Sequence, residues 1–317
     1  MPCTKIQNLV TELRRRNSTF VCLIGLRSEY HTLLEFVEER CRVSGSPKRT
    51  PTSSGLLEKF GRKIIFHLNS CLAFLTFVGK ITSALSFLML HPKQFRWSEL
   101  LSNIETAGVY ALPMIAMLSF MMGVVIAYQG GQQLYIYGAN IFIVELISLT
   151  MLRELAPLIT AISVAGRTGS AYTAQIGTMH VTEEVDALCT IGIPPIDLLV
   201  LPKLLALTVS LPLLTVFADA ISVFGGMVMA KILLSVNFSD FLERLPKVVT
   251  LTSFLLGLEK ALVFAVIISL VGCYQGFQVR GGADSVGRQT TLSVVQSIFL
   301  VVAADALFSV IVGGAGL

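Results

Sequence analysis

The chain has 317 residues, of which 54% are hydrophobic and only 14% are charged. A soluble domain carries roughly a quarter of charged residues, so this composition excludes an ordinary cytosolic enzyme, a disordered regulator and a disulfide scaffold. Residues 1–100 hold 15 Lys and Arg against 7 Asp and Glu, whereas residues 101–317 hold 9 against 13. A basic head therefore precedes a long apolar body, which predicts an all-α integral membrane protein.

Residues 1–45 form a basic amino-terminal segment with a mixed α/β pattern. A helical stretch near 6–16 leads into the β-like run Phe20–Ile24, and a second helical pattern follows it. This segment is short for an independent hydrophobic core. Residues 46–63 are rich in Ser, Pro and Thr over 46–54 and have the composition of a linker.

Residues 64–90 are strongly apolar and have basic residues at both ends. A membrane span usually has its positive charge on one side, whereas basic residues at both ends suit a helix that lies in the membrane interface. We therefore favour an interfacial helix over a span for 64–90.

Five later segments have the length and composition of membrane spans. The segment at 198–234 contains Pro212 and Gly225-Gly226, is too long for one upright span and short for two, and is predicted to be one tilted, kinked helix. The predicted spans lie near 107–128, 141–165, 198–234, 251–274 and 292–312.

The distribution of Lys and Arg outside the spans predicts the topology. With a cytoplasmic amino terminus, the cytoplasmic segments hold 19 Lys and Arg and the external segments hold two. The positive-inside rule favours this orientation, which leaves the carboxyl terminus outside.

The polar connection after the second span carries two rows of small residues spaced by four. On a helix such rows form a smooth face that another backbone can approach closely, either within the chain or at a dimer seam. The candidate positions on this face are Gly166, Gly169, Ser170, Ala174 and Gly177.

The same connection contains a predicted short helix over Thr182–Leu188. Thr182 is the expected N-cap, and acids in the first turn stabilise the helix through their interaction with its dipole. Val185 and Leu188 share one face, which suggests either an ordinary loop helix or an apolar ridge that docks on a partner. The residues of this candidate are Thr182, Glu183, Glu184, Val185, Asp186, Ala187 and Leu188.

Metal and nucleophile motifs are absent from the sequence. The six Cys form no C-x-x-C pair, the four His have no ligand spacing, and there is no Gly-x-Ser-x-Gly motif. We expect no metal site and no catalytic residue in this chain.

Four stretches within 153–195 are distinctive: Glu154–Leu158, Ala165–Ala171, Ile176–Met179 and Val181–Leu188. Together they resemble the signature of the MlaE (YrbE, TGD-type) permeases, the membrane subunits of ABC transporters that move phospholipids between envelope membranes. In arrangement, the resemblance covers about 90–317, and 1–45 weakly resembles the end of a STAS-like domain. One departure is Gln175, where many members have Glu.

The resemblance implies a homodimer in the inner (plasma) membrane of a bacterium with a double-membrane envelope. It implies membrane lipids as cargo, a cytoplasmic ATPase subunit that holds ATP and Mg²⁺, and an external MCE-domain protein; a nucleic acid partner is not expected. No Walker A sequence is present, since Gly79-Lys80 is followed by Ile81. Residues 182–188 would then be the helix that couples the permease to the ATPase.

Charged residues at bilayer depth are expensive and are functional candidates. Arg153, Glu154, Lys260 and Asp305 resemble the charged cavity positions of the family, either contacting a lipid head group or pairing with one another. A rival hypothesis is a proton-coupled secondary transporter with a carboxylate relay, although no inverted repeat is visible. The relay carboxylates would be Glu145, Glu154, Asp219 and Asp305.

Overall fold

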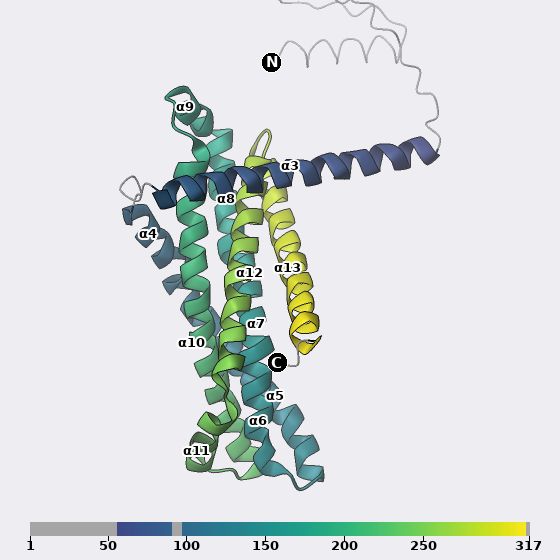
Figure 1. Ribbon diagram of the computed structural model, residues 1–317, viewed down its shortest axis with the longest axis vertical. Helices are drawn as coiled ribbons and strands as arrows, with labels where there is room; N and C mark the ends of the chain where they lie inside the picture. The colour runs from purple at the N-terminus through teal and green to yellow at the C-terminus, as the bar shows by residue number, and fades with distance from the viewer. Residues whose placement is uncertain (1–55, 91–96, 315–317) are drawn as a thin grey trace, which may run out of the picture. The chain divides into compact units, whose positions relative to one another are not determined.

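The computed structural model describes residues 56–90 and 97–314, and every secondary-structure element in these ranges is helical. This confirms the all-α prediction. The chain divides into two units, Met1–Phe66 and His67–Leu317, and the second unit contains the helical bundle (Figure 1). The mixed segment predicted at 1–45 lies outside the described residues.

Helix α3 (Leu56–Leu90) contains the predicted interfacial helix. It begins at Leu56, so the linker predicted over 46–63 extends too far. From His67 onward, α3 lies across the long helices of the bundle rather than alongside them (Figure 1). It contacts α12 through Phe74 and Phe77, whose rings lie 5.1 Å and 5.5 Å from that of Tyr274.

The first predicted span is made by α4 (Trp97–Ala107), the 3₁₀ turn η2 (Val109–Ala111) and α5 (Leu112–Ile136). Pro113 lies in the first turn of α5, where its missing N–H leaves no hydrogen bond unmade. The helix ends at Ile136 rather than at the predicted 128, so much of the predicted 129–140 loop is helical.

The second predicted span belongs to one helical path from Ile143 to Val181. The path comprises α6 (Ile143–Thr150), the π-helical η4 (Met151–Leu155), α7 (Ala156–Val164), the π-helical η5 (Ala165–Gly169) and α8 (Ser170–Val181). The connection predicted to leave the helix at 166 therefore stays helical to Val181. Its polar side chains are accommodated because the Ser170 and Thr173 hydroxyls donate to carbonyls four residues earlier.

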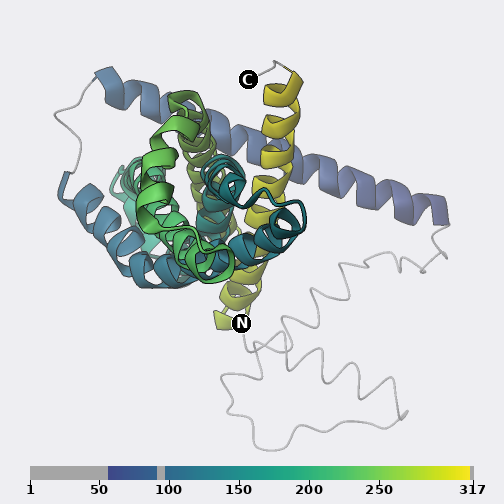
Figure 2. The same cartoon turned by 90° about the horizontal axis from the view of Figure 1, so that it is seen from below.

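The third predicted span is one helix, as expected. It comprises the π-helical η6 (Ile196–Val200) and α10 (Leu201–Leu234), and Pro212 lies inside it. A short α11 (Phe238–Val248), which the sequence reading did not predict, leads to α12 (Leu251–Phe277) and α13 (Ala283–Gly314). Viewed from below, α13 leans strongly away from the axis of the other long helices (Figure 2).

Five helices in the described ranges are long and apolar enough to cross a membrane: 68–88, 97–136, 196–234, 251–277 and 283–312. Four of them contain predicted spans. The fifth, Leu68–Leu88, is the segment predicted to be interfacial. The span predicted at 141–165 is absent from this set, although the helical path from Ile143 to Val181 runs through most of it.

Helices α5 and α10 pack with their backbones in close approach. A Cβ built on Gly123 would collide with the carbonyl oxygen of Ser222, and one on Gly225 would collide with that of Phe120. Each glycine therefore leaves room for the opposite backbone, as in the small-residue interfaces of membrane helices. A buried core of Ala, Ile, Leu and Phe side chains continues from this contact to α7 and α12.

Candidate functional site

Three of the charged residues predicted from the sequence meet inside the bundle. Lys260 Nζ on α12 lies 2.6 Å from Glu154 Oε2 on η4 and 3.0 Å from Asp305 Oδ1 on α13. The Ser309 hydroxyl, one turn after Asp305, donates to the Glu154 carboxylate over 3.1 Å. We call Glu154, Lys260, Asp305 and Ser309 the charged cluster.

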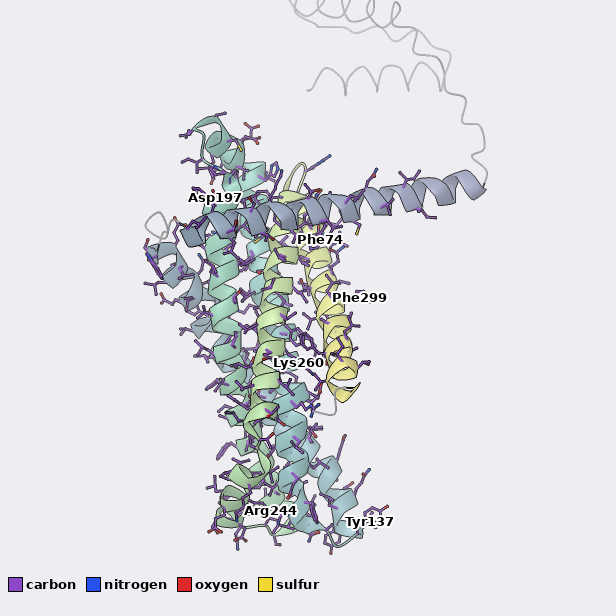
Figure 3. The ribbon with its side chains drawn as sticks, viewed as in Figure 1. Phe74, Tyr137, Asp197, Arg244, Lys260 and Phe299 are labelled. Carbon is purple, nitrogen blue, oxygen red and sulfur yellow. The ribbon has the colours of Figure 1, made fainter. Side chains whose placement is uncertain are left out.

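The charged cluster lies at depth in the bundle. Figure 3 shows Lys260 between Asp197 and Phe74 toward one end of the bundle and Arg244 and Tyr137 at the other. Helix α12 packs closely against η4 here. A Cβ on Gly257 would collide with the carbonyl oxygen of Leu152, so only glycine leaves room for this approach. This approach brings Lys260, one turn later on α12, to Glu154.

A fourth charged residue, Arg153, balances the charges of the cluster. Arg153 Nε lies 3.9 Å from Glu154 Oε1, so two cations accompany two carboxylates. Lys260 is 2% exposed, whereas the Glu154 side chain is 34% exposed. The lysine is thus enclosed by its partners, and the carboxylate and Arg153 are the groups that a polar ligand in the apolar bundle can reach.

The other relay carboxylates do not join this cluster. Glu145 Oε1 pairs with Arg244 on α11, with Arg244 Nη2 at 2.7 Å. Asp219 is buried on α10, and its Oδ1 has no hydrogen-bond partner among the described residues. Only Glu154 and Asp305 share a partner, Lys260, so the four carboxylates do not form one chain of hydrogen bonds among the described residues.

The predicted coupling helix forms as α9 (Glu184–Thr190), but its start differs from the prediction. The N-cap position is Glu183, with a left-handed φ of 62°, and not Thr182. The Thr182 hydroxyl instead bonds the Thr178 carbonyl at 3.1 Å and the Glu184 carboxylate at 2.9 Å. Thr182 therefore ends α8, and the chain reverses at Glu183.

The predicted apolar ridge of this helix faces inward. Val185 is buried within the chain, and Leu188 is half-buried. The exposed residues include Glu183, Glu184, Asp186 and Ala187, followed by Cys189, Thr190 and Ile191, of which Ile191 is 73% exposed. The surface that α9 offers to a partner is therefore acidic with one apolar tip at Ile191.

The small-residue rows separate into a packed row and an open row. Gly169 lies against Ile268 and Gly272 on α12, Gly177 lies against Val279, and the Thr173 hydroxyl donates to the Gly272 carbonyl over 2.8 Å. This row is an intramolecular seam. Gly166 would place a Cβ in open space, and Ser170 and Ala174 are half-buried on the same row. A dimer contact remains a prediction for the open row alone.

Sequence reasoning missed the three π turns and the cavity that two of them line. The cavity, of about 620 Å³, lies between α4, α8 and α10 and holds Lys203 and Tyr172. Lys203 follows Pro202 inside a predicted span. Its charge within an apolar run is the sequence signal that could have identified it. Among the described residues, no group of His, Cys, Asp and Glu is arranged to hold a metal ion.

Comparison with known proteins gives a consistent set of matches. The family model for Permease MlaE matches residues 100–311. A probable ABC transporter permease of Rickettsia bellii is 36% identical over 73% of this chain and 90% of the relative. A probable ABC transporter permease of Synechocystis is 37% identical over 63% of this chain and 76% of the relative. The chloroplastic protein TRIGALACTOSYLDIACYLGLYCEROL 1 of Arabidopsis thaliana is 31% identical over 68% of this chain and 62% of its own length.

Proposed function

Because the chain belongs to the MlaE permease family, we propose that this ABC transporter permease moves phospholipids or similar hydrophobic lipids between the inner and outer membranes of an envelope. The observation that carries the proposal is the charged cluster. It places reachable polar groups, Arg153 and Glu154, inside an otherwise apolar bundle. An amphiphile needs both kinds of surface, one for its acyl chains and one for its head group. The galactolipid name of the Arabidopsis relative also favours a lipid cargo.

The proposed assembly is a homodimer of this multi-pass membrane protein in the inner membrane. A separate ATPase subunit with ATP and Mg²⁺ binds on the cytoplasmic side, and an MCE-domain protein receives or delivers lipid outside. The amino terminus lies in the cytoplasm, the carboxyl terminus lies outside, and α3 lies in the interface. The crosswise course of α3 from His67 onward supports its interfacial placement.

Affinity purification of the full chain in mild detergent tests the assembly. We expect mass spectrometry to find an ATPase subunit and an MCE-domain protein with the chain. Reconstitution of that complex between donor and acceptor vesicles should then give lipid transfer that requires ATP. A folded chain recovered without any ATPase would favour the proton-coupled transporter instead.

Reversing charge on α9 is expected to uncouple transport from ATP hydrolysis. Glu184 and Asp186 are exposed acids on a short helix, so Lys at either position replaces the attraction of a basic ATPase groove with repulsion. We expect Glu184→Lys and Asp186→Lys to lower ATP-driven lipid transfer about tenfold, with normal expression and elution on size-exclusion chromatography.

The matched control for this experiment is Asp240→Lys, an exposed acid on α11 at the other end of the bundle. It should leave ATP-driven transfer unchanged.

Ile191→Arg should weaken co-purification of the ATPase, because it changes the exposed apolar tip of the α9 surface. Full transfer by all of the α9 variants would show that the ATPase engages a different surface.

A further inference from the structure

The cavity between α4, α8 and α10 encloses a cation that forms no direct ion pair within the described residues, although the Glu99 carboxylate lines the same cavity. Lys203 is 5% exposed, and among the described residues it makes no hydrogen bond or ion pair. Its Nζ lies 5.4 Å from the centre of the Tyr172 ring, within the range of a cation–π contact. A buried ammonium without a carboxylate in direct contact is unfavourable, so an anionic ligand would stabilise this arrangement. We call this cavity the Lys203 pocket.

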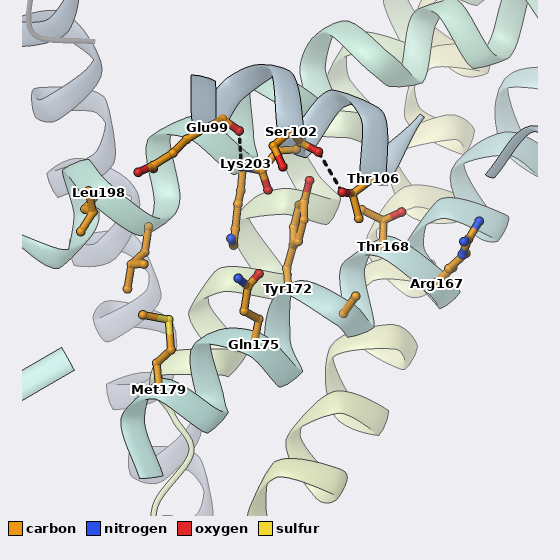
Figure 4. Close-up of a pocket in the computed structure, with 13 residues that line it drawn as sticks. Glu99, Ser102, Thr106, Arg167, Thr168, Tyr172, Gln175, Met179, Leu198 and Lys203 are labelled. Atoms are coloured by element: carbon orange, nitrogen blue, oxygen red, sulfur yellow. Dashed lines mark hydrogen bonds between the residues drawn. The ribbon is translucent and has the colours of Figure 1, made fainter. Parts of the chain in front are cut away.

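A second buried polar group in the Lys203 pocket also has no partner. Tyr172 is 4% exposed, and its hydroxyl makes no hydrogen bond within the described residues. Figure 4 shows Tyr172 and Gln175 from α8 and Lys203 from α10 directed into the same space. The pocket therefore presents a charged donor and a phenolic donor together.

The remaining charges of the pocket leave a net charge of +1. Arg167 on η5 lines it with Lys203, against the single carboxylate of Glu99 on α4. Arg167 Nη1 donates to the Tyr110 carbonyl, which fixes the guanidinium and leaves its other N–H groups available. The net charge matches the single negative charge of a phosphodiester.

Apolar side chains line another part of the pocket. Met179, Leu198 and Leu199 belong to this part, and a free inorganic anion would gain nothing from them. The volume of about 620 Å³ is in the range of small-molecule sites and suits a glycerophosphate head group rather than an entire lipid. Basic pockets between membrane helices are known to hold anionic head groups.

We propose that the Lys203 pocket binds the phosphate of an anionic phospholipid, with Lys203 and Tyr172 as the main donors. It is separate from the charged cluster, which is formed by η4, α12 and α13. This proposal rests on the proposed function, because the membrane orientation proposed there places the pocket at the cytoplasmic leaflet. Binding is measured without transport, so its failure and that of the proposed function are distinguishable.

The test titrates the purified full chain in detergent with phosphatidylglycerol and counts bound lipid by native mass spectrometry. We expect Lys203→Met to weaken binding about tenfold or more, because it removes a charged hydrogen bond. Tyr172→Phe, which removes only the hydroxyl, should weaken it roughly fivefold. Lys203→Arg should retain binding, and the control Lys231→Met, an exposed cation on the same helix, should have no effect.

Two further arms identify the ligand. Diacylglycerol with the same acyl chains should bind weakly and be insensitive to Lys203→Met, because it has no phosphate. Inorganic phosphate at millimolar concentration should not displace the lipid; displacement, with phosphate binding lost in Lys203→Met, would assign the pocket to free phosphate and overturn the lipid proposal. Equal phosphatidylglycerol binding by Lys203→Met and the unaltered chain would overturn the site itself.

Discussion

Lys260→Met should abolish ATP-driven lipid transfer and destabilise the bundle by about 3 kcal/mol. The substitution removes the cation that holds Glu154 and Asp305 at 2.6 Å and 3.0 Å and leaves two carboxylates facing each other. Loss of one partner of a buried ion pair is expensive because the other stays buried without compensation. We expect a destabilisation at the lower end of the range for a broken buried ion pair, since the Glu154 side chain is one-third exposed. Thermal unfolding in detergent and vesicle transfer measure the two effects.

A double variant separates charge balance from packing at this cluster. Lys260→Met with Asp305→Asn removes one charge of each sign and should recover more than half of the lost stability. Transfer should remain low in the double variant if the cluster contacts the lipid. If the Lys260→Met protein unfolded at the same temperature as the unaltered protein, that result would contradict the burial of this charge.

Gly123→Leu should destabilise the protein by about 3 kcal/mol, the upper end for overpacking. A side chain at this position points into the backbone of α10 at Ser222, and a backbone cannot change rotamer to make room. The two helices would have to separate, which would open the core along their length. We expect a lower unfolding temperature, measured by size-exclusion chromatography after heating.

The control for this substitution is Gly79→Leu in α3. Gly79 is exposed, lies within a helix, and has nothing within 4 Å of a built Cβ. Leu is a better helix former than Gly, so this variant should unfold at or slightly above the native temperature. Similar unfolding temperatures for the two leucine variants would show that α5 and α10 are not in close approach.

The helical class and most span positions could be predicted from composition because each span is a long apolar run. The third span was correctly predicted to be one helix, since Pro212 kinks a helix without ending it when neighbouring helices pack around it. Glu154, Lys260 and Asp305 could likewise be singled out, because a charge within an apolar run is visible without a structure. Their mutual pairing depends on which helices are neighbours, which sequence spacing does not contain.

Two local predictions failed for physical reasons. The small and polar residues at 166–181 suggest a connection outside the membrane, yet the row of Gly169 and Gly177 packs on α12 and keeps the segment helical. Thr182 has the side chain of an N-cap, but it was already engaged by the last carbonyls of α8. In both cases a contact from a neighbouring element or turn outweighed the local pattern.

The π turns η4 and η5, which lie on the helical path from Ile143 to Val181, also change how this chain is compared with its relatives. A π turn takes up one residue more than an α turn, and one residue corresponds to about 100° of rotation on an α-helix. Deleting one residue in Ala165–Gly169 would thus leave an unbroken helix but rotate the whole of α8 relative to α7. Gly169 and Thr173 would leave their seam with α12. In an alignment of the family, a single-residue gap inside either π turn thus marks a change of helical phase, and not the loss of a loop residue.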